Sequence, residues 1–215
     1  MKSLRWARFG IPAVLVAVSP VRPQSRGAEA ESVLLDNHDP ICRAANAFQI
    51  KPRLAASVIF VEQFKNVNWV DRKLDVVFAD YGYNSSIGIG QVKVKTAEWI
   101  EETLHDPTCQ YYPGDDFAKT IPQSGSREDL VKRLNDPWWN AKYVAANLRL
   151  ILERWERAGV EITSSVDISA TLYSTGVVAG DKEKKSPHPN PQPNDFGRLA
   201  KRFYESDLLL FWYPR

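Results

Sequence analysis

Glu62 is the one charged residue in the stretch LAASVIFVEQF, which is otherwise almost entirely apolar. Leu54, Val58 and Glu62 are four residues apart, so they fall on one stripe of the helix that this stretch predicts. A carboxylate at the end of an apolar stripe loses hydration, which raises its pKa. A carboxyl that stays protonated near neutral pH can act as a general acid. The simpler alternative is a Glu that is solvated at the helix end or paired with Lys65 or Arg72.

Cys42 and Cys109 each end a His-Asp-Pro-x-Cys motif, HDPIC and HDPTC. If the protein is exported, a disulfide between them is the simplest interpretation and would add about 3–4 kcal/mol of stability. Two His and two Cys could instead hold a tetrahedral zinc, although Pro in each motif is expected to break the helix on which the pair would converge. A Cys–His nucleophile is the third possibility. His-Asp-Pro is also typical of a helix start.

The first thirty residues have the features of a secretory signal peptide. Three basic residues within the first eight precede an apolar run at residues 9–18. This run is short for a bilayer span and suits a signal peptide, and the sequence Ala-Glu-Ala at 28–30 offers a cleavage site. We therefore expect residues 1–30 to be removed and the protein to be exported, to the periplasm or outside the cell. An uncleaved membrane anchor is the alternative.

Residues 31–215 have the size of one domain and carry little net charge. The whole chain has 28 basic and 26 acidic residues, and residues 1–30 hold five of the basic ones and one of the acidic ones. The basic surplus therefore belongs to the predicted leader, and nothing indicates a nucleic-acid partner. We expect a monomer whose contact with membranes is limited to the leader.

The remaining pattern predicts a mainly α fold in which helices hold the candidate acid. A long loop follows the Glu62 helix, a small irregular or β patch covers residues 76–92, and residues 187–193 form a proline-rich loop. Ser126 and Asp136-Pro137 are expected to begin helices. Helices are predicted at 40–48, 52–64, 96–104, from 126, at 138–159 and 165–173, and from 195 or 197 toward 210.

Four segments, read in order, resemble the lysozyme-like lytic transglycosylase domain, which is related to the goose-type lysozymes. They are LAASVIFVEQ (54–63), GIGQV (88–92), NAKYVAANLRLIL (140–152) and ATLYSTG (170–176). In that family a helix ending in Glu is followed by a Gly-hydrophobic-Met-Gln turn, an N-x-x-x-x-x-Y-L helix and an A-Y-N-x-G segment. The resemblance covers residues 40–180 and implies a lysozyme-like fold, with a cleft between the 52–64 helix and the 76–92 patch.

The chain departs from the family pattern at several positions. Gln63 stands where the family usually has Ser, Gly90 where it has Met, and Ser174 where it has Asn. The interval from Glu62 to Gly88 is also longer than is usual in the family. These departures leave the subfamily and the glycan specificity open.

The resemblance implies a role for each matching residue. Glu62 would be the catalytic acid, Gln91 would line the cleft, and the hydroxyl of Tyr173 would contact the catalytic carboxyl. Ser174 would cover part of the role of the missing Asn. From the residues alone, Gln91 could equally be an amide that braces a turn, and Tyr173 a core aromatic.

Glycines and tryptophans are the other candidates for contact with a sugar. Gly88 and Gly90 have no side chain, so the backbone could approach a glycan closely there, and an ordinary turn is the alternative. Among the tryptophans, Trp69 is the best candidate to stack on a sugar because it lies in the long loop. Core packing is the default for most of Trp99, Trp138, Trp139 and Trp155.

The resemblance also implies a reaction. The substrate would be peptidoglycan, cleaved between N-acetylmuramic acid and N-acetylglucosamine, with one Glu as acid and then base and a 1,6-anhydro product. No metal or cofactor is required. A lysozyme-type hydrolase would instead need a second carboxylate, for which Asp71, Asp75 and above all Asp80 are candidates. A non-catalytic glycan-binding or scaffold module is a further alternative.

Overall fold

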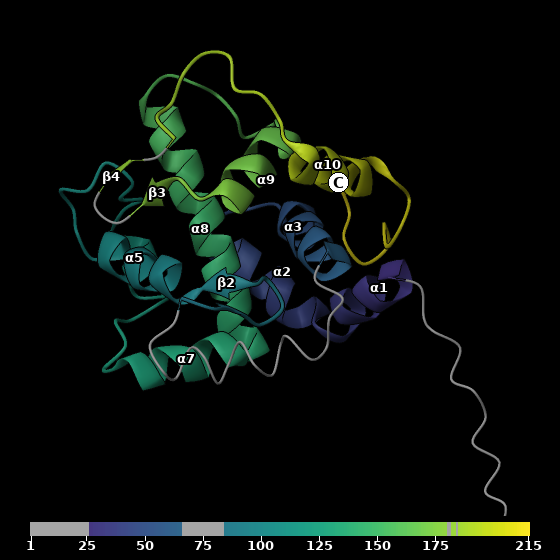
Figure 1. The fold of residues 1–215 in the computed structure, drawn as a ribbon, viewed down its shortest axis with the longest axis horizontal. Helices are drawn as coiled ribbons and strands as arrows, with labels where there is room; N and C mark the ends of the chain where they lie inside the picture. The colour runs from purple at the N-terminus through teal and green to yellow at the C-terminus, as the bar shows by residue number, and fades with distance from the viewer. Residues whose placement is uncertain (1–25, 66–83, 180–181, 184) are drawn as a thin grey trace, which may run out of the picture.

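The computed structural model describes residues 26–65, 84–179, 182–183 and 185–215, and within them the chain is mainly helical (Figure 1). Two antiparallel two-stranded sheets pair β1 with β2 and β3 with β4. The predicted mainly α fold is therefore confirmed. The predicted patch at 76–92 is described only from residue 84 on, where β1 and β2 pair, and residues 76–83 lie outside the described residues. The elements are α1 (Arg26–Asp36), α2 (His38–Ala47), α3 (Pro52–Lys65), β1 (Ser86–Ile87), β2 (Val92–Lys93), α5 (Val94–Leu104), α6 (Asp115–Ala118), α7 (Arg127–Asn135), α8 (Pro137–Arg157), α9 (Val166–Thr175), β3 (Val178–Ala179), β4 (Lys182–Glu183) and α10 (Asp195–Glu205).

Helix α8 is the centre of the fold, with α2, α3, α5, α7 and α9 packed against it (Figure 1). Its start was predicted from Asp136-Pro137. The Asp136 carboxylate accepts hydrogen bonds from the backbone N–H groups of Trp138, at 2.9 Å, and Trp139, at 3.1 Å. Pro137 occupies the first turn, where a missing N–H costs nothing. Local capping chemistry therefore fixes the position of the central helix.

Most other predicted helices form close to their expected boundaries, but α1 and α6 were missed. No helix was predicted before residue 40, whereas α1 begins at Arg26 and buries Ala30 and Leu34 completely. The cleavage point expected after Ala30 falls inside this helix. Ser126 caps α7 as predicted, because its hydroxyl accepts a hydrogen bond from the N–H of Asp129 at 3.1 Å.

Helix α10 ends at Glu205, short of the predicted residue 210, because the following segment turns back toward α3. The side chain of Arg53, in the first turn of α3, is fully buried and donates to five backbone carbonyls of this region. These belong to Phe203, Tyr204, Ser206, Leu208 and Tyr213, at 2.6–3.2 Å.

Within the described part of the chain, no helix combines the length and the apolar character needed to cross a bilayer.

Candidate functional site

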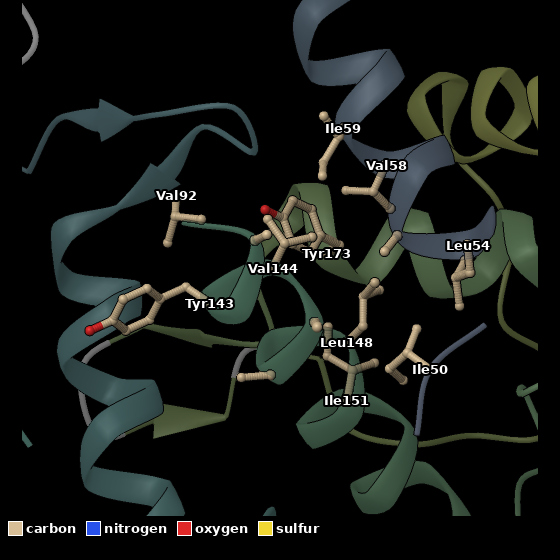
Figure 2. Close-up of a cluster of buried hydrophobic side chains, with 14 of the residues drawn as sticks. Ile50, Leu54, Val58, Ile59, Val92, Tyr143, Val144, Leu148, Ile151 and Tyr173 are labelled. Atoms are coloured by element: carbon tan, nitrogen blue, oxygen red, sulfur yellow. The ribbon is translucent and has the colours of Figure 1, made fainter. Parts of the chain in front are cut away.

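Glu62 lies in the last turn of α3, at the end of a helix that is buried on nearly every side. All residues from Arg53 to Val61 are buried, and so is Gln63, whereas Glu62 is half-buried. Leu54 and Val58, which share its stripe, lie in the core with Ile59 (Figure 2). The Glu62 side chain therefore lies at the edge of the apolar interior, at the end of the helix, which is the position that the sequence predicted.

Tyr173 of α9 lies in the same core cluster as Val58 and Ile59 of α3 and Val144 of α8 (Figure 2). Its hydroxyl donates a 2.7 Å hydrogen bond to the carbonyl of Gly90. Burial raises the pKa of Tyr173 well above its ordinary value, and the nearby Glu62 carboxylate raises it further. The tyrosine is therefore a neutral hydroxyl in the neighbourhood of Glu62. It comes from an element that follows Glu62 by more than a hundred residues.

The turn between β1 and β2 is fixed by Asn140 of α8, which is fully buried. The Asn140 Nδ2 donates to the carbonyls of Ile87, at 2.9 Å, and Leu134, at 2.8 Å. Its Oδ1 accepts from the N–H of Gly90 at 2.8 Å. Asn140 begins one of the four motif segments, but the sequence pattern indicated no role for it. It lies four residues after the cap residue Asp136, in the first turns of the central helix.

Gly88 and Gly90 are required by internal packing, and their predicted contact with a sugar stays a prediction. Gly88 has a φ of +76°, and a Cβ there would lie 2.2 Å from Asn140 Nδ2. A Cβ on Gly90 would lie 2.1 Å from Val144 Cγ2. Real Cβ atoms do not approach neighbours so closely, so both glycines exist because the turn lies directly on α8.

Two glutamines connect this turn to the end of α3. Gln63 Nε2 donates to the carbonyl of Ile89 at 2.6 Å, which ties the residue after Glu62 to the turn. Gln91 has a φ of 49°, and its Nε2 donates to the carbonyl of Gly88 at 2.9 Å. Gln91 is half-buried and braces its own turn, while still lining a pocket beside it. Sequence analysis noted Gln63 only as a departure from a family pattern.

Ser174 has local partners. Its hydroxyl donates to the carbonyl of Thr171 at 3.0 Å and accepts from Nδ2 of Asn194 at 3.1 Å. Asn194 is also the N-cap of α10. Ser174 therefore helps to join α9 to the start of α10. Trp69 and the aspartates at 71, 75 and 80 lie outside the described residues.

The other tryptophans mostly pack within the protein, as expected by default. Trp155 is almost completely buried and Trp99 packs edge-on against Tyr111. Trp139 lies beneath the cations of Arg133 and Lys142. Trp138 is the exposed member of the group.

Cys42 and Cys109 are free thiols, so the predicted disulfide is absent. They have different surroundings. Cys42 Sγ lies 3.4 Å from His38 Nε2 on α2, whereas Cys109, in the segment after α5, has its Sγ 4.0 Å from Thr103 Oγ1. Burial raises the pKa of the Cys42 thiol, and Asp39 raises it further, which is the reverse of an activated nucleophile.

The two His-Asp-Pro-x-Cys motifs adopt different structures. The first motif begins α2, and Pro40 lies in the first turn of that helix. The proline was expected to break the helix between His38 and Cys42, but at this position it does not. In the second motif, His105 follows the end of α5 and its Nδ1 lies 2.8 Å from the carbonyl of Glu101. Among the described residues, no group of three or more His, Cys, Asp or Glu could hold a metal ion.

The four motif segments of the sequence thus meet at one place. The end of α3, the β1–β2 turn, the start of α8 and the end of α9 are joined by the hydrogen bonds of Gln63, Asn140 and Tyr173. This arrangement can hold one half-buried carboxyl beside a neutral hydroxyl and a rigid turn. Comparisons with protein-family models, with curated proteins and with solved structures found no match.

Proposed function

We propose that the protein is an exported lytic transglycosylase that cleaves peptidoglycan with Glu62 as its single acid and base. The observation that carries this proposal is the nearness of Glu62 to the buried Tyr173, whose hydroxyl is bonded to Gly90. The site offers one carboxyl at the end of an apolar helix, and the next residue, Gln63, ties that helix end to the β1–β2 turn. Positioning of this kind accounts for several kcal/mol of a reaction barrier.

The direction of the Tyr173 hydrogen bond supports the role of Glu62 as an acid. A tyrosine hydroxyl has one proton, and Tyr173 donates it to the carbonyl of Gly90. Toward Glu62 the hydroxyl oxygen can then only accept a hydrogen bond. Such a partner suits a carboxyl that carries a proton, which is the form that a general acid needs.

The proposed reaction is a β-1,4 cleavage between N-acetylmuramic acid and N-acetylglucosamine. Glu62 protonates the leaving glycosidic oxygen, and the bond from C1 to that oxygen breaks with assistance from the neighbouring N-acetyl group. The ionised Glu62 then removes the proton from the C6 hydroxyl as this oxygen bonds to C1. The muramyl end leaves as a 1,6-anhydro sugar, and the glutamic acid is restored in its protonated form.

The test is to digest purified sacculi with the wild type and with Glu62→Gln, and to weigh the released muropeptides. An anhydro end has one water less than a hydrolytic end, so the two reactions differ in mass. We expect anhydro ends from the wild type and none from the variant, which keeps the shape of the side chain but cannot donate the proton in the same way. Reducing ends alone would indicate a lysozyme-type hydrolase with a second carboxylate such as Asp80. Binding of sacculi without cleavage would indicate a non-catalytic module.

A further inference from the structure

A small pocket lies beside the β1–β2 turn, between α1, the end of α3 and the end of α7 (elements in Figure 1). Its volume is about 270 Å³, which is enough for one sugar ring. Glu62 does not line it, but the next residue, Gln63, does. The pocket therefore flanks the candidate acid, and two of its walls, α1 and α7, lie outside the four motif segments.

The polar wall of this pocket is made largely of side-chain amides. Asn37 Nδ2 donates to the carbonyl of Val33 at 2.8 Å, and Asn135 Nδ2 donates to the carbonyl of Val131 at 3.0 Å. Gln91 Nε2 is likewise bonded, to the carbonyl of Gly88. In the part of the chain that the structure describes, no donor reaches the amide oxygens of these three side chains. Each nitrogen uses one of its two N–H groups in this way, so every one of these amides can still offer a ligand its oxygen as an acceptor and one N–H as a donor.

The remaining wall combines one carboxylate with apolar side chains. Asp36 lines the pocket, and its carboxylate accepts a hydrogen bond from the Ser32 hydroxyl at 3.3 Å. Val33, Ile87 and Ile89 supply the apolar surface. None of the described lining residues is a Lys, Arg or His, so the pocket has no group that would attract an anion.

These features select a ligand whose polar edge both donates and accepts hydrogen bonds and which has one apolar face. A pyranose ring has both, because its hydroxyl and acetamido N–H groups project from the edge and its C–H groups form a face. We propose that the pocket is a saccharide subsite that binds one N-acetylhexosamine ring of the substrate glycan. This inference rests on the proposed function for the identity of the glycan, although the pocket itself is defined by its own residues.

The test uses Asn37→Leu and Asn135→Leu in a Glu62→Gln background, which prevents cleavage during titration. Leu has nearly the shape of Asn. The amide nitrogens of Asn37 and Asn135 each bond to the carbonyl four residues earlier in the chain, so these substitutions break no contact between distant elements and the fold is expected to persist. The probe is the tetrasaccharide of β-1,4-linked N-acetylglucosamine, titrated by amide NMR shifts. Each variant is expected to weaken binding by about fivefold to tenfold, which corresponds to the loss of one hydrogen bond.

Gln192→Leu is the matched control, because Gln192 is an exposed amide outside the pocket and its Nε2 bonds to Asn190. Its affinity for the tetrasaccharide should equal that of the background protein. Unchanged affinity in both pocket variants, or no binding of the tetrasaccharide at all, would overturn the subsite. The same substitutions in the active enzyme should raise KM with sacculi by a similar factor and leave kcat unchanged.

Failure of the subsite and failure of the proposed function give different results. A protein that binds the tetrasaccharide through Asn37 and Asn135 but never cleaves sacculi would retain the subsite and refute the transglycosylase. A protein that produces anhydro muropeptides with unaltered KM in both variants would retain the enzyme and refute the subsite.

Discussion

Both polar groups of Gly90 are held by side chains from other helices. Its carbonyl accepts a hydrogen bond of 2.7 Å from Tyr173 of α9, and its N–H donates one of 2.8 Å to Asn140 of α8. The glycine is buried, so each of these groups would be costly to leave unpaired. The turn beside Glu62 is thus held rigid by two elements that are far from it in the sequence.

Removing the Tyr173 hydroxyl should weaken both the fold and the proposed reaction. In Tyr173→Phe the Gly90 carbonyl loses its partner, so we expect the free energy of unfolding to fall by about 1–3 kcal/mol, measured by urea denaturation. The rate at which the variant cleaves sacculi should fall by more than the decrease in the folded fraction of the protein explains. Tyr213→Phe is the matched control, because Tyr213 is also buried and its hydroxyl donates to the carbonyl of Leu34 at 2.7 Å. A similar loss of cleavage in both variants would show that Tyr173 acts on stability alone.

Gly90→Ala should destabilise the protein mainly through one contact. The new methyl group would overlap Val144 Cγ2 at 2.1 Å, whereas Asn140 Oδ1 and Tyr173 Oη would each lie 3.2 Å away, and overpacking of this kind costs about 1–3 kcal/mol. Val144→Ala removes the atom concerned, so the double variant should be more stable than the sum of the two single losses predicts. Gly125→Ala is the control, because no atom lies within 4 Å of the Cβ that it would add. If Gly90→Ala instead kept full stability and lost only glycan binding, close approach of a sugar would be the reason for the glycine.

Local chemistry allowed much of the fold to be predicted. The starts of α7 and α8 follow from Ser126 and from Asp136-Pro137, since a cap acts within three residues of itself. The buried course of α3 follows from its run of apolar residues. Helix α1 was missed because its pattern was divided at an expected cleavage site.

The candidate site could be predicted only in part, because its contacts are distant in the sequence. Glu62 was identified from its neighbours on the same helix. The role of Asn140 depends on Gly90, 50 residues away, and no local pattern encodes that pairing. Likewise, the two His-Asp-Pro-x-Cys motifs have the same key residues but different structures. One begins a helix and the other follows one, because the residues before each motif differ.

The two cysteines should behave as free thiols, and folding should slow the reaction of Cys42. Titration of the unreduced, denatured protein should find two thiols, since neither sulfur is bonded to the other. Near pH 8 Cys42 should react more slowly in the folded protein than in the denatured protein, because its raised pKa leaves less thiolate. Its rate should continue to rise at higher pH. Mass spectrometry after brief alkylation identifies each site, with Cys42→Ser as the control for assignment. Absence of free thiols would restore the disulfide.

Arg53 should be among the most sensitive positions for stability. Its guanidinium is buried, and within the described residues it has no carboxylate at ion-pair distance. Burial lowers the pKa of Arg53, and the nearby Arg215 lowers it further. Its donors instead hold the carbonyls of α10 and of the segment after it. Arg53→Met would remove one donor from all five, and those of Leu208 and Tyr213 have no second donor among the described residues. We expect a loss of more than about 3 kcal/mol in urea denaturation.

Arg53→Lys separates the charge of Arg53 from its geometry. Lysine keeps the charge but lacks the planar guanidinium group, so it can donate to only some of the same carbonyls. The free energy of unfolding of Arg53→Lys should therefore lie between that of the wild type and that of Arg53→Met. Amide hydrogen exchange at residues 206–213 should accelerate in both variants, because this segment loses its attachment to α3. Arg215→Met is the control, because Arg215 holds neighbouring carbonyls from a half-exposed position and is expected to contribute less than about 1 kcal/mol. Equal losses in Arg53→Met and Arg215→Met would mean that the segment is attached by its surface contacts, and that the buried guanidinium only fills space.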